Sequence, residues 1–240
     1  MYKTLSALMI LICIASASNA QLEEKIKKHD VEIGEIYKDG KTIIGYIRSK
    51  SLIEYDGLYY PQPWQYQKSI KFIPKDVFEK TEKIKGKLYD KYNAKDIEGY
   101  KIDTLIYKSV KYADMTAVGT GMIAKKMFIK KISDGRISLF YHYGTPPPAG
   151  EMSYIKEETI NCQEPNLVYQ IGENGKVKLV QHLNINKELA DCEEVIKAFG
   201  KKTDDNSAAD NDKPSGIIKD VLLREDYRLS AIESYNKNCQ

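Results

Sequence analysis

The chain has 240 residues, of which 42% are hydrophobic and 30% are charged, and its mean hydropathy is -0.49. These values exclude a disordered chain, a collagen-like chain and a multi-span membrane protein. The formal net charge of +3 is too small to favour nucleic acid or an anionic membrane as a partner. The 18 Tyr, against one Trp and five Phe, favour β structure with amphipathic faces.

Residues 1–20 have the pattern of a secretory signal peptide. Lys3 supplies a positive charge, residues 5–17 are apolar or small, and small residues precede a cleavage site before Gln21. The apolar run is shorter than the roughly 20 residues of a membrane-spanning helix, and Cys13 lies inside it, which disfavours a lipid anchor. We therefore expect an exported protein with no transmembrane segment after cleavage. The periplasm is the favoured location, with secretion or outer-membrane association as alternatives.

Removal of the signal leaves three cysteines, Cys162, Cys192 and Cys239. An oxidising compartment permits a disulfide, and three pairings are possible, each leaving one thiol over. We favour Cys192 with Cys239, because both lie in the helical C-terminal part, where a bridge would hold the chain end. Cys162 is then expected to be a small buried hydrophobe, since no His or cationic pair lies beside it in the sequence.

Strand patterns dominate residues 21–185, which we expect to form a β-rich domain. Three pairs of apolar runs are each joined by Asp-Gly or Asn-Gly, the dipeptides that favour the type I′ turn of a hairpin. The expected hairpins are 31–36 with 42–47, 127–132 with 136–143, and 167–171 with 177–183. Shorter strands are expected at 69–73, 83–88, 100–102 and 104–110.

The pattern changes after residue 185, where apolar residues recur at helical spacing. Residues 186–199 and 217–240 each carry such a stripe and predict two helices. Residues 200–216 between them are polar, without a large apolar side chain, and predict a flexible linker. The expected fold is mainly β and α+β overall: an antiparallel sheet, a sandwich or a partly closed barrel, with the C-terminal helix packed on the β domain.

No motif along the chain indicates catalysis or a cofactor. Residues 119–124 match the G-x-G-x-x-A fingerprint of dinucleotide sites, but an Asp-Gly hairpin signal follows where that site needs a helix. No nucleophile elbow or zinc-ligand spacing accompanies the histidines. We therefore expect a non-catalytic protein. A site that joins His142 or His182 to distant residues, as in an envelope hydrolase, stays an alternative.

The candidate binding surface is an aromatic segment that contains Tyr59, Tyr60, Trp64 and Tyr66, stiffened by two prolines. Exposed Tyr and Trp rings stack on sugars or anchor a protein partner at low entropic cost. The alternative is that these rings cover the open end of the sheet.

Six short motifs follow one another along the chain: residues 45–47 (GYI), 70–73 (IKFI), 96–100 (DIEGY), 128–141 (FIKKISDGRISLFY), 189–192 (LADC) and 234–239 (SYNKNC). This ordered set resembles exported proteins of unknown function from Bacteroidetes-type bacteria, and the resemblance covers most of the chain after the signal. It implies export and a β-rich fold, with no assigned activity and no catalytic residues.

These observations favour an exported cell-envelope protein that binds a macromolecule without catalysis or serves as a structural module. A glycan- or small-ligand-binding protein that uses the aromatic segment is the first alternative, and an envelope hydrolase is the second. The expected partner is an envelope protein or a glycan, and not nucleic acid, because basic residues are mixed with acidic ones along the chain.

Overall fold

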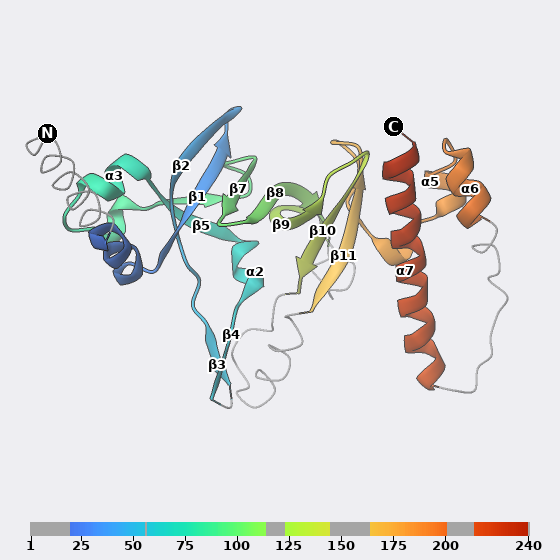
Figure 1. Cartoon of the computed structure of the whole chain (residues 1–240), viewed down its shortest axis with the longest axis horizontal. Helices are drawn as coiled ribbons and strands as arrows, with labels where there is room; N and C mark the ends of the chain where they lie inside the picture. The colour runs from blue at the N-terminus through green and yellow to red at the C-terminus, as the bar shows by residue number, and fades with distance from the viewer. Residues whose placement is uncertain (1–19, 56, 114–122, 145–163, 201–213, 240) are drawn as a thin grey trace, which may run out of the picture. The chain divides into compact units, whose positions relative to one another are not determined.

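The structure is a computed structural model that describes residues 20–55, 57–113, 123–144, 164–200 and 214–239 (Figure 1). The predicted signal peptide, Cys162, most of the 119–124 motif and most of the predicted linker lie outside these residues. Of the described residues, 40% lie in strands and 31% in helices, so the prediction of a mainly β fold is confirmed.

The main sheet has ten antiparallel strands and is not closed into a barrel. Its hydrogen-bonded order is β12-β11-β10-β9-β8-β7-β1-β2-β5-β6. The strands are β1 Val31–Lys38, β2 Lys41–Arg48, β5 Ser69–Pro74, β6 Asp90–Asn93, β7 Gly99–Ile102, β8 Leu105–Tyr112, β9 Lys125–Ser133, β10 Ile137–Tyr143, β11 Pro165–Ile171 and β12 Lys178–Leu179. A separate two-stranded sheet pairs β3 Ile53–Tyr55 with β4 Leu58–Tyr60.

The chain divides into two compact units, Met1–Ser109 and Val110–Gln240. The division falls inside residues 21–185, which the sequence predicted as one β-rich domain. Strand β8 spans it and contains neither Pro nor Gly, so no change of composition marks it in the sequence.

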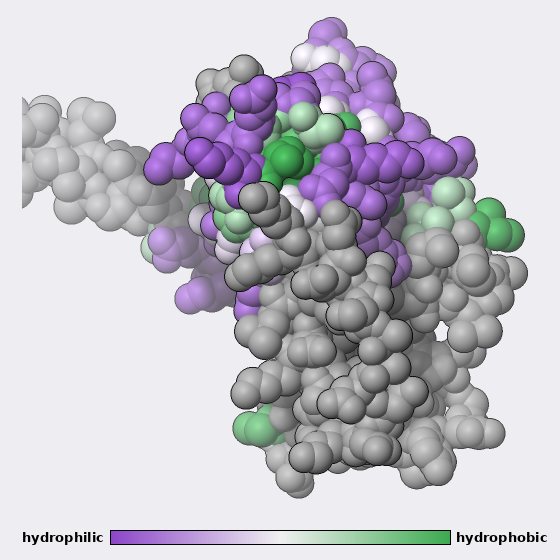
Figure 2. Space-filling model, turned by 90° about the vertical axis from the view of Figure 1, so that its right-hand side faces the viewer, coloured by the Kyte–Doolittle hydropathy of each residue, from purple (hydrophilic) through white to green (hydrophobic). Residues whose placement is uncertain are grey.

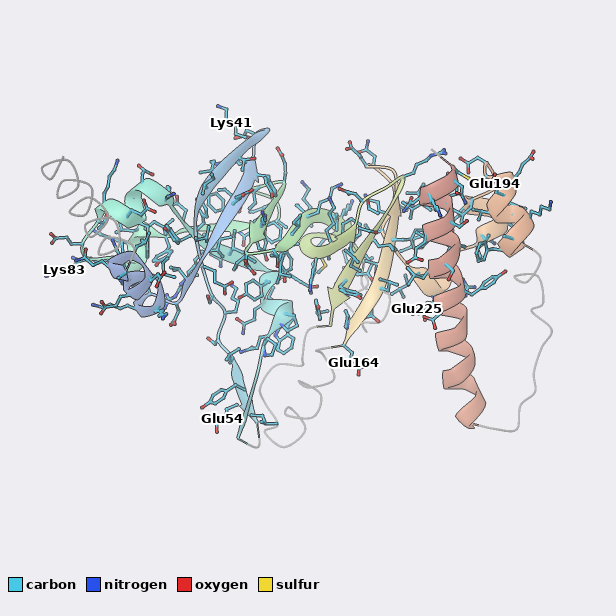
Figure 3. All side chains as sticks on the ribbon, in the orientation of Figure 1. Lys41, Glu54, Lys83, Glu164, Glu194 and Glu225 are labelled. Atoms are coloured by element: carbon cyan, nitrogen blue, oxygen red, sulfur yellow. A yellow bond between two sulfur atoms is a disulfide. The ribbon has the colours of Figure 1, made fainter. Side chains whose placement is uncertain are left out.

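In the first unit, β1 lies between β2 and β7. The predicted β1–β2 hairpin is confirmed, and its register places Lys38 opposite Lys41. Asp39 and Gly40 have φ of 52° and 68°, the positive values that a type I′ turn requires at both central positions. The side chain of Lys41 points away from the tip of this hairpin (Figure 3).

One face of the first unit's strands is covered by helices. Val31, Tyr46, Ile73 and Phe78 form a buried cluster that includes side chains from a helix over residues 20–28 and from α3 (Lys75–Lys80). On the other face, the Tyr100 and Tyr107 rings stack with centroids 4.7 Å apart. Tyr46 is therefore buried on one face of the sheet, and Tyr100 is buried on the other.

The strand predicted at 83–88 is wrong. The structure has a short 3-10 helix there, η1 (Gly86–Leu88). Strand β5 already pairs with β2 along one edge and with β6 along the other, so neither edge of β5 remains for this segment. Ile84 and Leu88 instead pack against the buried cluster that contains Tyr46 and Phe78.

In the second unit, the β9–β10 hairpin is confirmed, with an irregularity in register between Leu139 and Phe140. The third predicted hairpin is shorter than expected: β12 pairs with β11 at two positions, and the chain then turns into η3 (Val180–His182). One face of β10 and β11 packs against the long helix α7 (Pro214–Asn238), with Ala231, Ile232 and Tyr235 in the core (Figure 1).

The helix predicted over 186–199 is two helices, α5 (Ile185–Glu188) and α6 (Glu193–Phe199). Between them Cys192 forms the predicted disulfide with Cys239, with Cα atoms 5.8 Å apart (Figure 3). The backbone of Cys192 is extended, with φ of -121° and ψ of 94°, so the helix does not continue through it. The bridge joins the start of α6 to the end of α7. Helix α7 begins three residues before the predicted start at 217.

The coloured surface on the side of α6 and α7 is mostly hydrophilic, with a small apolar area (Figure 2). Among the described residues, no helix combines the length and apolar character needed to cross a membrane.

Candidate functional site

A groove of about 700 Å³ opens in the first unit, where β2 ends and the aromatic segment runs alongside. We call it the strand-end groove. All but three of its lining residues carry plainly polar side chains. It is lined by Asp30, Glu32, Arg48, Ser49, Lys50, Ser51, Leu52, Pro61, Gln62, Gln65, Tyr66 and Lys71.

Hydrogen bonds hold the two walls of this groove. The Ser49 amide donates to the Asp30 carbonyl at 2.7 Å, and the Ser49 hydroxyl donates to a Glu32 carboxylate oxygen at 2.9 Å. On the other wall, the Gln62 side-chain amide donates to the Ser51 carbonyl at 2.9 Å. The chain that leaves β2 is therefore tied both to the preceding strand and to the aromatic segment.

Lys50 lies at the centre of the wall. Its ammonium donates to the Ser69 carbonyl at 2.7 Å and lies 6.0 Å from the centre of the Tyr66 ring. The Lys50 amide donates to the Tyr66 hydroxyl at 3.2 Å. Burial lowers the pKa of Lys50 below its ordinary value, and the positive charges of Lys71 and Lys91 lower it further.

The surrounding charges are predominantly positive. Lys71 lies directly opposite Lys91 in the β5–β6 pair, an arrangement of like charges that destabilises a sheet. Arg48 adds a third cation at the last position of β2. Asp30 and Glu32 line the groove as acceptors, so it combines cations, carboxylates and amides in one open surface.

The four predicted binding residues do not share one exposed surface. Trp64 is only 4% exposed in the short helix α2 (Pro63–Tyr66), whereas Tyr59 in β4 is 66% exposed. Tyr66 is half-buried, stacks on Tyr107 at 5.9 Å and lines the groove. Tyr60 lies in β4, and its side chain is outside the described part. The aromatic segment thus contributes to the groove mainly through Tyr66 and the residues around it.

Sequence reasoning missed the cations of the groove. Arg48, Lys50 and Lys71 are ordinary surface residues in the sequence, and only the pairing of β2 with β5 brings them together. The signal that pointed to this region was the aromatic segment, whose Pro61, Gln62, Gln65 and Tyr66 line one wall.

A second groove of about 400 Å³ lies in the second unit, between β9, β10, β11 and α7. Its apolar lining includes Ile132, Leu139, Leu167 and Leu229, and Asp134, Glu233 and Lys237 also line it. This groove continues the packing of α7 on the sheet and contains none of the predicted binding residues.

A polar cluster fastens the end of α7 to the second unit. Asp191 accepts hydrogen bonds from the Tyr235 hydroxyl at 2.9 Å and from the Arg136 guanidinium at 2.6 Å. These partners, the tyrosine first, hold the pKa of the Asp191 carboxyl below its ordinary value. Asn236 donates to the Ile137 carbonyl at 2.7 Å and accepts from the Ile137 amide at 2.9 Å. We call these residues, with the disulfide, the C-terminal lock.

Neither histidine of the hydrolase alternative lines either of these two grooves. His142 is 2% exposed in β10, with its ring 4.7 Å from that of Tyr112, and His182 lies in η3. Within the described ranges, no group of three His, Cys, Asp or Glu side chains could hold a metal ion.

Comparison of the chain with protein-family models, with curated proteins and with solved structures finds no match.

Proposed function

We propose that this protein is an exported, non-catalytic module of the cell envelope that binds a macromolecule through the strand-end groove. The observation that carries the proposal is the groove itself. Its volume of about 700 Å³ falls in the range of roughly 300–1,000 Å³ that is usual for ligand sites. Its walls are held by hydrogen bonds within the first unit, so it needs little rearrangement to bind.

Export is supported by two features. Residues 1–20 carry the signal-peptide pattern, and the Cys192–Cys239 disulfide is typical of proteins that fold in an oxidising compartment. N-terminal sequencing of the protein recovered from the envelope tests this part. A first residue at Gln21 supports export with cleavage, and an uncleaved chain retained in the cytoplasm would contradict it.

A glycan-binding protein is the second candidate, and the groove changes how it would work. The sequence favoured stacking on Tyr59, Tyr60, Trp64 and Tyr66, but Trp64 is buried. The groove instead offers amides, carboxylates and one half-buried tyrosine. A Trp64→Ala variant would therefore report on folding of α2 as much as on binding.

The test of the proposed function is photo-crosslinking in the native envelope. A photoreactive amino acid replaces Gln62 in the groove, and a matched variant carries it at Lys41, at the tip of the β1–β2 hairpin. We expect a recurrent protein or glycan adduct from position 62 and none from position 41. Equal adducts from both positions, or none from position 62, would contradict a binding role for the groove.

A further inference from the structure

The cations of the strand-end groove form no ion pair with a carboxylate of the residues that the structure describes. In the described part of the chain, the ion pairs involve other residues, and none includes Arg48, Lys50 or Lys71. Asp30 and Glu32 line the same groove, yet neither forms an ion pair with these cations.

The lack of a carboxylate partner is unfavourable for Lys50. Its ammonium has three donors, and it is held by the Ser69 carbonyl and faces the Tyr66 ring. The charged side chains that lower its pKa are Lys71 and Lys91, both positive. A partly buried charge with like-charged neighbours gains stability from a counter-ion. An anionic group of a ligand would therefore bind favourably beside Lys50 and Lys71.

The remaining lining favours a ligand rich in hydroxyl groups. Ionised Asp30 and Glu32 accept hydrogen bonds and cannot donate them, so they suit a ligand with hydroxyl donors. Gln62 and Gln65 provide amides, and Leu52, Pro61 and Tyr66 provide apolar surface on which the face of a sugar ring can lie. A neutral glycan would satisfy these groups but leave the cations without a partner.

We propose that the strand-end groove binds an anionic oligosaccharide, whose acidic group lies among Arg48, Lys50 and Lys71 while its hydroxyl groups bond to Asp30 and Glu32. This inference rests on the proposed binding role of the groove and names the ligand class. A carboxylate and a phosphate on the sugar both provide negative charge, so the two sources are distinguished by experiment.

The test is isothermal titration calorimetry of the exported, disulfide-bonded protein with three probes. The first is a galacturonic acid oligosaccharide, the second is the same oligosaccharide fully methyl-esterified, and the third is a phosphorylated mannose oligosaccharide. Lys71→Gln and Arg48→Gln remove groove cations at exposed positions, and Lys41→Gln is the matched control on the β1–β2 hairpin. Fluorescence of Trp64, the one tryptophan of the chain, reports binding next to Gln65 and Tyr66.

We expect one or both acidic probes to bind at least tenfold more tightly than the ester. Lys71→Gln and Arg48→Gln should each weaken that binding about fivefold or more, because each removes a positive charge that attracts the acidic group of the probe. Lys41→Gln should change the binding less than twofold. Preference for the galacturonic acid probe assigns a carboxylate, and preference for the phosphorylated probe assigns a phosphate.

Four outcomes overturn the inference, and together they separate its failure from failure of the proposed function. Equal binding of the acidic probe and its ester, or acidic binding that Lys71→Gln and Arg48→Gln leave unchanged, refutes the anionic ligand. If no probe binds but the groove still crosslinks to an envelope protein at position 62, the ligand class is wrong and the binding role stands. If no probe binds and no adduct forms at position 62, both fail.

Discussion

Replacing Asn236 by Ala tests whether the C-terminal lock stabilises the second unit. The Asn236 side chain bonds both the amide and the carbonyl of Ile137, at 2.9 and 2.7 Å, and so pairs with the first residue of β10 as a neighbouring strand would. Ile137 is fully buried. The alanine variant leaves two main-chain groups of Ile137 without these partners.

Each buried polar group left without a hydrogen-bond partner lowers the free energy of unfolding by about 1–3 kcal/mol, and water that enters the space recovers part of that loss. We therefore expect Asn236→Ala to lower the free energy of unfolding by about 2–4 kcal/mol. With a urea dependence of about 2 kcal/mol/M, the unfolding midpoint should fall by about 1–2 M. Asn238→Ala is the matched control, because the Asn238 side-chain amide donates to the Ser234 hydroxyl at 3.3 Å on the exposed surface.

The assay is urea unfolding of the disulfide-bonded protein, followed by circular dichroism at 222 nm, where α7 contributes strongly. Hydrogen exchange of the Ile137 amide measures the local effect. A Cβ on Gly135 would lie 2.6 Å from the Asn236 side chain. Gly135→Ala should therefore lower the free energy of unfolding more in the otherwise unchanged protein than in the Asn236→Ala variant. A loss below about 0.5 kcal/mol for Asn236→Ala, or equal losses for both asparagines, would refute the reasoning.

Three further predictions concern the same two units. Cys239→Ser should lower the unfolding free energy by about 3–4 kcal/mol, because the disulfide closes a loop with a sequence separation of 47; thermal unfolding with and without a reductant measures this, and an unchanged midpoint would contradict it. Gly45→Ala should destabilise the first unit by more than about 1 kcal/mol, because the added Cβ would lie 2.2 Å from a carbonyl oxygen of β5. Gly86→Ala is the control and should not destabilise it, because the space around Gly86 is open. Urea unfolding followed by Trp64 fluorescence measures both variants, and equal losses would contradict the prediction. Asp191 has a lowered pKa in the folded protein, so its contribution to stability is present above its unfolded pKa of roughly 4 and is lost as the pH falls through the lower folded value. Asp191→Asn should therefore flatten the stability profile below roughly pH 4, and an unchanged profile would argue against this role.

The motifs behind the family resemblance meet in space in the second unit. Arg136 and Ile137 come from the motif at 128–141, Asp191 and Cys192 from the motif at 189–192, and the last motif supplies Tyr235, Asn236 and Cys239. Together they form the C-terminal lock. The C-terminal lock therefore gives these three motifs a structural role, and family membership itself stays a prediction.

The sequence alone predicted two hairpins, the disulfide and the long C-terminal helix. Asp39-Gly40 and Asp134-Gly135 indicated hairpins because such dipeptides accept the turn geometry between alternating strands, and both hairpins are present. The Cys192–Cys239 pair followed from two cysteines in one helical region. Helical spacing indicated α7 within three residues of its start, since a long periodic stripe is a strong signal.

The arrangement of distant segments was decided only by the tertiary structure. Short elements such as α3 and η1 carry too few residues for a periodic signal, and the occupied edges of β5 decide what the segment at 83–88 becomes. Likewise, the sequence indicated the aromatic segment, but burial of Trp64 and the gathering of Arg48, Lys50 and Lys71 into one groove depend on which strands pair. Composition and spacing determined the class of fold and the turns, because those depend on neighbouring residues. The groove depends on contacts between residues far apart in the chain, and only the folded sheet brings those residues together.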